Sequence, residues 1–138
     1  MNKKQLVEFI PLSVFLIAEA CRFLHFPYST IAATIGGFIS SCVYFYASYW
    51  LYASYNISPV NRIIAGLSFS TTIIALLFCL SNWPFGHVYT VISSVLLAVP
   101  LVTSLVNYKN TAYKQFLYRS IFFVVLLSMS YWYRSVGV

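Results

Sequence analysis

Three ionisable residues follow one another at three-residue spacing near the end of the first apolar segment: Glu19, Arg22 and His25. Residues three apart on a helix share a face, so the carboxylate and the guanidinium are expected to reach each other. Charged groups at the middle of a membrane helix cost about 2.5–3.5 kcal/mol each and are kept with partners or for a function. Two interpretations remain open: an ion pair that joins the first helix to its neighbours, and a proton- or ligand-binding site.

The only other acidic residue, Glu8, lies eleven positions before Glu19. Eleven residues are close to three helical turns, so both acids are expected on one stripe, about 16 Å apart along the axis. We interpret Glu8 as an acid at the membrane interface, beside Lys3 and Lys4. A proton relay that uses both acids is the alternative.

Catalytic and metal-binding patterns are missing from the sequence. It contains no G-x-S-x-G, no H-E-x-x-H and no Walker loop, and it has no aspartate. Cys21, Cys42 and Cys79 lie singly inside apolar runs, without the spacing of a metal or redox motif. We therefore expect a protein that is not an enzyme and that binds no cofactor or metal.

The composition indicates which solvent surrounds the chain. Hydrophobic residues make up 61% of it and charged residues 7%, whereas soluble domains carry about 25% charged residues. The net charge of +6 comes from single basic residues at the ends of apolar runs, and nucleic-acid binding would need them clustered on one face. The sequence predicts a single-domain integral membrane protein with the lipid bilayer as its partner.

Five apolar stretches approach the length of about 20 residues that a membrane-spanning helix needs. They cover residues 6–24, 29–53, 63–81, 86–106 and 116–133. Backbone groups must be paired within lipid, so the predicted fold is an all-α bundle of four to five transmembrane helices. The fifth stretch is the weakest because Arg119 lies near its start, and a helix on the membrane surface is the alternative there.

Basic residues predict the orientation, because cytoplasmic loops carry an excess of lysine and arginine. With the N-terminus in the cytoplasm, the outer side receives Arg22 and Arg134. The cytoplasmic side then receives six basic residues: Lys3, Lys4, Arg62, Lys109, Lys114 and Arg119. We expect a multi-pass protein of the bacterial inner membrane whose first segment remains as an anchor.

Two short aromatic–proline turns connect the apolar stretches in pairs. Pro27 lies in the first turn, and Trp83 and Pro84 lie in the second. Proline suits the end of one helix and the first turn of the next. An offset of 57 residues places the first turn on the second, which favours two tandem copies of one hairpin, at about 6–53 and 63–106. Independent convergence on a proline turn is the alternative.

Gly36 and Gly37 make the second stretch thin, with Ala32 and Ala33 one turn earlier. Small residues let membrane helices approach closely. We expect close helix packing there, and a slot for a ligand is the alternative.

The first turn also carries a resemblance to a known family. The run Arg22-Phe23-Leu24-His25-Phe26-Pro27, followed by Ile35-Gly36, resembles the K-x-x-H-W-P-G…I-I-G pattern of the membrane hairpin in the GldL family of gliding-motility motor proteins. Small membrane proteins of the Bacteroidetes share that hairpin, and residues 77–86 are similar to a second, diverged copy. The family implies a proton-coupling glutamate after the turn, but the matching position here is Ser40 or a close neighbour. The family's large cytoplasmic domain has no counterpart either. The resemblance therefore implies the hairpin architecture and disfavours a proton-driven motor.

Three functions fit these features. The favoured one is a non-enzymatic accessory or scaffold subunit of a larger inner-membrane complex, with other membrane subunits or further copies of itself as partners. A small transporter or channel that uses the polar cluster of the first helix is the second. A membrane immunity protein is the third, although no particular residue argues for it.

Overall fold

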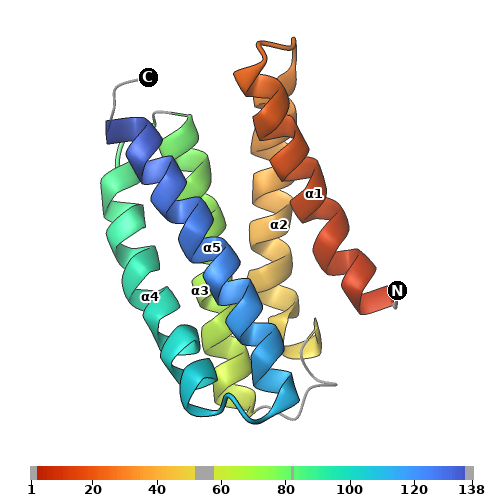
Figure 1. Cartoon of the computed structure of the whole chain (residues 1–138). Helices are drawn as coiled ribbons and strands as arrows, with labels where there is room; N and C mark the ends of the chain where they lie inside the picture. Colours follow the sequence, from red (N-terminus) through yellow and green to blue (C-terminus); the bar gives the residue numbers. More distant parts are fainter. Residues whose placement is uncertain (1–2, 52–57, 82, 136–138) are drawn as a thin grey trace.

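The computed structural model describes residues 3–51, 58–81 and 83–135, and these residues fold into five α-helices (Figure 1). The helices are α1 (Lys3–Phe23), α2 (Ser29–Leu51), α3 (Pro59–Leu80), α4 (Gly86–Val106) and α5 (Thr111–Ser135). The predicted all-α bundle is confirmed, and α4 begins and ends at the predicted residues. The predicted end of the second stretch, at residue 53, lies outside the described part of the chain.

Four of these helices, α2 to α5, are long and apolar enough to cross a membrane. The fifth stretch of the sequence is among them, since residues Tyr113–Ser135 qualify. The helix that does not qualify is α1, which carries two lysines, two glutamates and one arginine in 21 residues. The weakest span by composition is therefore the first helix rather than the last.

The central helix of the bundle is α3. It packs against α2 on one side and against α4 and α5 on the other, while α1 packs against α2. A helix that is apolar on every face is expected in the interior, and Ala65, Phe69, Ile73 and Leu76 of α3 are all buried. Helix α3 thus connects the α1–α2 hairpin with α4 and α5 (Figure 1).

The two aromatic–proline turns have the same hydrogen bonds. The Phe26 N–H donates to the Cys21 carbonyl at 3.1 Å, and the Trp83 N–H donates to the Phe78 carbonyl at 2.9 Å. Both bonds reach back five residues, and donor and acceptor of the first lie 57 positions before those of the second. The predicted offset therefore relates two turns with one local structure.

Backbone angles give the same correspondence. Tyr28, just after Pro27, has φ 62°, and Phe85, just after Pro84, has φ 67°. A left-handed conformation costs roughly 1–2 kcal/mol for a residue other than glycine, and both turns carry this cost at the matching position. Each left-handed residue is followed directly by the first residue of a helix, α2 or α4.

The two glycines of α2 lie against α1. A Cβ added to Gly36 would come within 3.1 Å of the backbone of Phe15, and one added to Gly37 within 3.2 Å of the Phe15 ring. These glycines let the two helix backbones approach closely, as small residues do in membrane bundles. The space beside them is filled by Phe15, which is fully buried.

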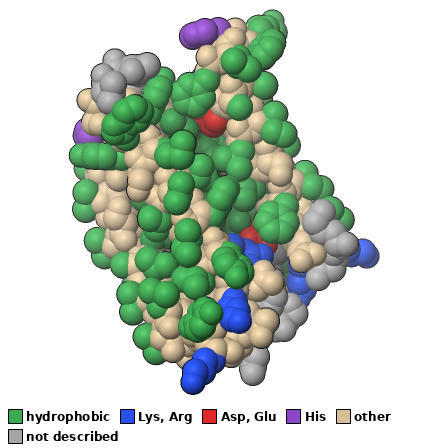
Figure 2. All heavy atoms as spheres, viewed as in Figure 1, with side chains coloured by type: hydrophobic (Ala, Val, Ile, Leu, Met, Phe, Trp, Pro, Cys, Tyr) green, Lys and Arg blue, Asp and Glu red, His purple; other side chains and the backbone are tan. Residues whose placement is uncertain are grey.

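The surface has two kinds of region. Figure 2 shows Lys and Arg side chains gathered toward the end of the molecule where α1 and α5 begin, with apolar side chains over much of the face beyond them. Exposed large side chains such as Ile17, Ile31, Val91 and Val95 lie on the outside of α1, α2 and α4. In water such a surface would be unfavourable, whereas in lipid it is the expected exterior.

Candidate functional site along the seam between α1 and α5

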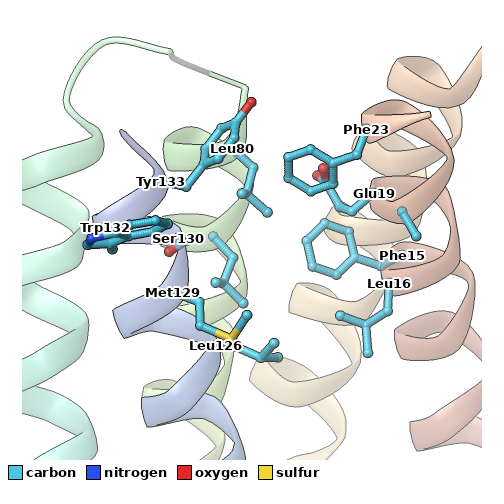
Figure 3. Close-up of a pocket in the computed structure, with 12 residues that line it drawn as sticks. Phe15, Leu16, Glu19, Phe23, Leu80, Leu126, Met129, Ser130, Trp132 and Tyr133 are labelled. Carbon is cyan, nitrogen blue, oxygen red and sulfur yellow. The ribbon is translucent and has the colours of Figure 1, made fainter. Parts of the chain in front are cut away.

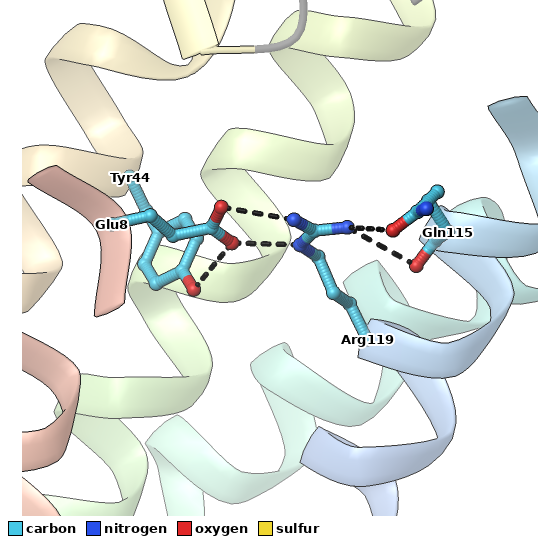
Figure 4. A network of polar contacts seen from close by, with 4 residues as sticks. All are labelled: Glu8, Tyr44, Gln115 and Arg119. Carbon is cyan, nitrogen blue, oxygen red and sulfur yellow. Dashed lines mark hydrogen bonds and ion pairs between the residues drawn. The ribbon is translucent and has the colours of Figure 1, made fainter. Parts of the chain in front are cut away.

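A buried ion pair joins α1 to α5 near the beginning of both helices (Figure 4). The Arg119 guanidinium donates to both carboxylate oxygens of Glu8, with Nε to Oε1 at 2.7 Å and Nη2 to Oε2 at 3.0 Å. The Tyr44 hydroxyl of α2 donates to Oε1 at 3.0 Å. Glu8 is only 3% exposed, so three helices meet at one carboxylate.

The surroundings hold Arg119 in this bidentate geometry. Its Nη1 faces the backbone and side-chain oxygens of Gln115, both at 3.4 Å, and its guanidinium carbon lies 5.8 Å from the centre of the Phe9 ring. The planar guanidinium matches a carboxylate better than a lysine would. We expected Glu8 at the membrane interface, beside Lys3 and Lys4. That expectation did not include these partners: the carboxylate is buried and pairs with Arg119 of α5.

The sequence does not by itself identify Arg119 and Tyr44 as partners of Glu8. A signal for Arg119 was present, because Glu8 lies five residues after the start of α1 and Arg119 eight residues after the start of α5 (8 − 3 and 119 − 111). Helices α1 and α5 run in the same direction, so the two charges lie at similar depth. Charges within a membrane are usually paired. Because the chain has only two acidic residues, Glu8 is one of two possible acidic partners for a basic residue within the membrane.

The middle of the seam is filled with rings. Glu8, Leu12, Phe15 and Glu19 are all buried and lie on one stripe of α1, as the eleven-residue spacing predicted. Behind them, the Tyr44 ring makes edge contacts with Phe69 and Phe123 at 5.5 and 5.8 Å. Aromatic side chains therefore separate the carboxylate of Glu8 from that of Glu19.

Glu19 and Arg22 lie together at the other end of α1. Arg22 Nη2 is 2.7 Å from Glu19 Oε2, and Arg22 Nη1 donates at 2.8 Å to the hydroxyl of Ser81, the residue just after α3. The short approach to Glu19 is off the N–H direction, so within the described residues it is an ion pair without a directed hydrogen bond. Glu19 is 4% exposed, and this pair is the i, i+3 contact that its spacing allowed.

The third residue of the predicted cluster, His25, lies apart from Glu19. It is exposed and has φ 60°, in the turn that follows α1. Together with Arg22, Ser81 and Trp83 it lines a shallow hollow at this end of the bundle. Glu19 is therefore paired with Arg22. Arg22 and His25 both line the more polar hollow.

A cleft of about 370 Å³ lies between α1 and α5 below this hollow (Figure 3). One wall is formed by Phe15, Leu16, Glu19 and Phe23 of α1, and the opposite wall by Leu126, Met129, Trp132 and Tyr133 of α5, with Leu80 of α3 between them. The Phe23 and Tyr133 rings meet edge to face at 5.1 Å. The lining is apolar except for Glu19 and Ser130.

The far end of α5 is attached to a different neighbour. Arg134 Nη1 donates to the carbonyls of Trp83 at 3.0 Å and Phe78 at 3.5 Å, and the guanidinium covers Gly86 at the start of α4. One end of α5 is thus bonded to α1 and the other to the α3–α4 turn. This arrangement explains why the seam opens into a cleft toward the Arg134 end.

Comparison of the chain with protein-family models, with curated proteins and with solved structures finds no match. The geometry of the seam is therefore the basis for a function.

Proposed function

We propose that this chain is a non-enzymatic accessory or scaffold subunit of a larger complex in the bacterial inner membrane. The observation that carries the proposal is the filled interior of the bundle. Phe15, Tyr44, Phe69 and Phe123 occupy its middle, and the buried Glu8 is bonded to Arg119.

Such an interior suits a rigid structural unit. A transporter needs alternating access to a polar site at the bilayer midplane, whereas the middle here is a packed aromatic cluster. Hydrogen bonds also join neighbouring helices. The Ser41 and Ser70 hydroxyls lie 2.8 Å apart, between α2 and α3, and the Ser68 hydroxyl donates to the Leu96 carbonyl of α4 at 2.9 Å. A subunit that supports other membrane proteins would gain from this rigidity.

The test is affinity purification of the tagged full chain from its native membrane in a mild detergent. The proposal expects a second membrane protein in a fixed ratio, or a defined oligomer of this chain. The charged-to-neutral variant Lys109→Ala, altered at an exposed end of the bundle, is the control for charge-driven sticking. Recovery of a lone monomer under these conditions would reject the proposal.

One observation favours a small transporter as the second candidate. Glu19 is a buried carboxylate in the wall of a cleft, and intramembrane acids often serve proton pathways. Purified protein in liposomes would then pass protons, and Glu19→Gln would abolish the flux. Absence of flux, or equal flux in Glu19→Gln, excludes this candidate.

The proposed placement has the N-terminus in the cytoplasm. The clustering of basic side chains at the end where α1 and α5 begin supports it through the positive-inside rule (Figure 2).

We also infer that the hairpins arose from one duplicated unit, and that their ancestor resembled the hairpin of the GldL family. The shared hydrogen bonds and left-handed residues of the two turns support the duplication.

A further inference from the structure

The cleft and the hollow above it share three wall residues: Phe23, Leu80 and Tyr133. The cleft is apolar along most of its length, while the hollow contains Arg22 and His25. Taken together, the adjacent cleft and hollow form a depression whose lining changes from apolar to basic over about one helical turn. A ligand that fits it has a hydrocarbon part and an anionic part side by side.

We propose that the depression binds one membrane phospholipid, with an acyl chain in the cleft and the phosphate against Arg22. The cleft lies between helices that face lipid, so hydrocarbon reaches it without crossing water. Arg22 is the single arginine of α1 and sits in its final turn, where the interface and the phosphates of a bilayer are expected. The acyl chain and the phosphate therefore meet the protein at the depths that they have in the membrane.

Charge complementarity supports a phosphate. At this end of the described structure Arg22 and Arg134 carry two positive charges and Glu19 one negative charge, which leaves +1. A phosphodiester carries −1. Arginine has five N–H donors, and Arg22 uses one nitrogen for its hydrogen bond to Ser81 while it pairs with Glu19 by charge, so donors remain for a phosphate. In this arrangement Glu19 and Ser81 are positioning residues that hold the guanidinium at the rim.

The size of the cleft argues against a partner helix as the occupant. A helix is about 10 Å across with its side chains, so two turns displace on the order of 850 Å³. The cleft offers about 370 Å³, and a helix laid along the seam would remain largely outside it. A single hydrocarbon chain is narrow enough for a cleft of this volume, and apolar side chains such as Leu16 and Met129 line it.

The experiment measures phospholipid bound per chain after extensive washing of the full-length protein in detergent, by native mass spectrometry. Wild-type protein is expected to retain about one phospholipid. Ala20→Trp fills the cleft from an exposed position of α1 and should abolish retention. Ala32→Trp, at an exposed position of α2, is the matched control and should retain lipid.

A second arm tests the phosphate. The double variant Glu19→Gln/Arg22→Gln removes the guanidinium without leaving a buried unpaired carboxylate. It should bind added phosphatidylethanolamine or phosphatidylglycerol about tenfold more weakly than wild type, because a charge-assisted hydrogen bond to the phosphate is lost. Diacylglycerol, which lacks the phosphate, should bind wild type and the double variant equally.

Loss of all lipid from washed wild type, or equal retention by Ala20→Trp, overturns the proposal. Equal binding of diacylglycerol and phospholipid to wild type would reject the proposed contact between the phosphate and Arg22. A stoichiometric protein in place of the lipid would assign the cleft to a partner instead.

Discussion

Replacing Arg119 with leucine should destabilise the bundle more than any other single change of charge. Arg119 donates two hydrogen bonds to Glu8, at 2.7 and 3.0 Å, and Tyr44 donates another. Without Arg119 the buried carboxylate loses the guanidinium that pairs with its charge. Removal of one partner of a buried pair costs about 3–5 kcal/mol, and we expect a loss of unfolding free energy in this range for Arg119→Leu.

The reasoning predicts an order among related variants. Tyr44→Phe removes one hydrogen bond to a charged group and should cost about 1.5–3 kcal/mol. Glu8→Gln/Arg119→Gln removes both charges of this pair and should be more stable than Arg119→Leu alone, since replacing both partners is often close to neutral. Lys114→Leu removes a cation from the same helix that lies over the Tyr108 ring at 5.2 Å and should cost under about 1 kcal/mol.

The assay is reversible unfolding of the purified chain in mixed detergent micelles, with rising denaturing detergent and helix content followed by circular dichroism. A double-mutant cycle between Glu8 and Arg119 isolates their coupling. A coupling near zero, or an Arg119→Leu variant as stable as Lys114→Leu, would refute the view that this pair holds α1 to the bundle.

Three further predictions follow from particular contacts. Gly36→Leu should cost about 1–3 kcal/mol in the same unfolding assay, because the new side chain meets the backbone of Phe15; an unchanged stability would contradict the close approach. Tyr28→Gly and Phe85→Gly should each stabilise or leave unchanged the unfolding free energy, by up to about 1 kcal/mol, since glycine relieves the left-handed strain; clear destabilisation of both would argue against it. In a cysteine-free background, Tyr28→Cys and Lys109→Cys should react with an impermeant maleimide from opposite sides of intact membrane, and labelling from one side would reject the topology.

The positions of the helices followed from the sequence because lipid imposes a simple rule. Each apolar run between polar connections had to become a helix, and Gly86 and Val106 were identified as the ends of α4. The stripe that contains Glu8 and Glu19 also followed, since helical periodicity fixes which side chains share a face.

The partners of Glu8 did not follow from the sequence, because they depend on which helices become neighbours. Glu8 and Arg119 are 111 residues apart, and hydropathy does not specify that α5 returns beside α1. The cleft is still harder to predict. It arises because Arg119 and Arg134 attach the two ends of α5 to different elements, and the resulting splay is a property of tertiary structure alone.

The charged helix α1 is proposed as an integral part of the membrane bundle, held there by Glu8 and Arg119. Hydrogen–deuterium exchange of the purified protein in lipid nanodiscs can test this placement, with the backbone amides between Leu12 and Glu19 compared between wild type and Arg119→Leu. We expect protection in wild type close to that of α3 and a clear loss of protection in the variant. Rapid exchange of α1 in wild type, or equal protection in both proteins, would contradict it.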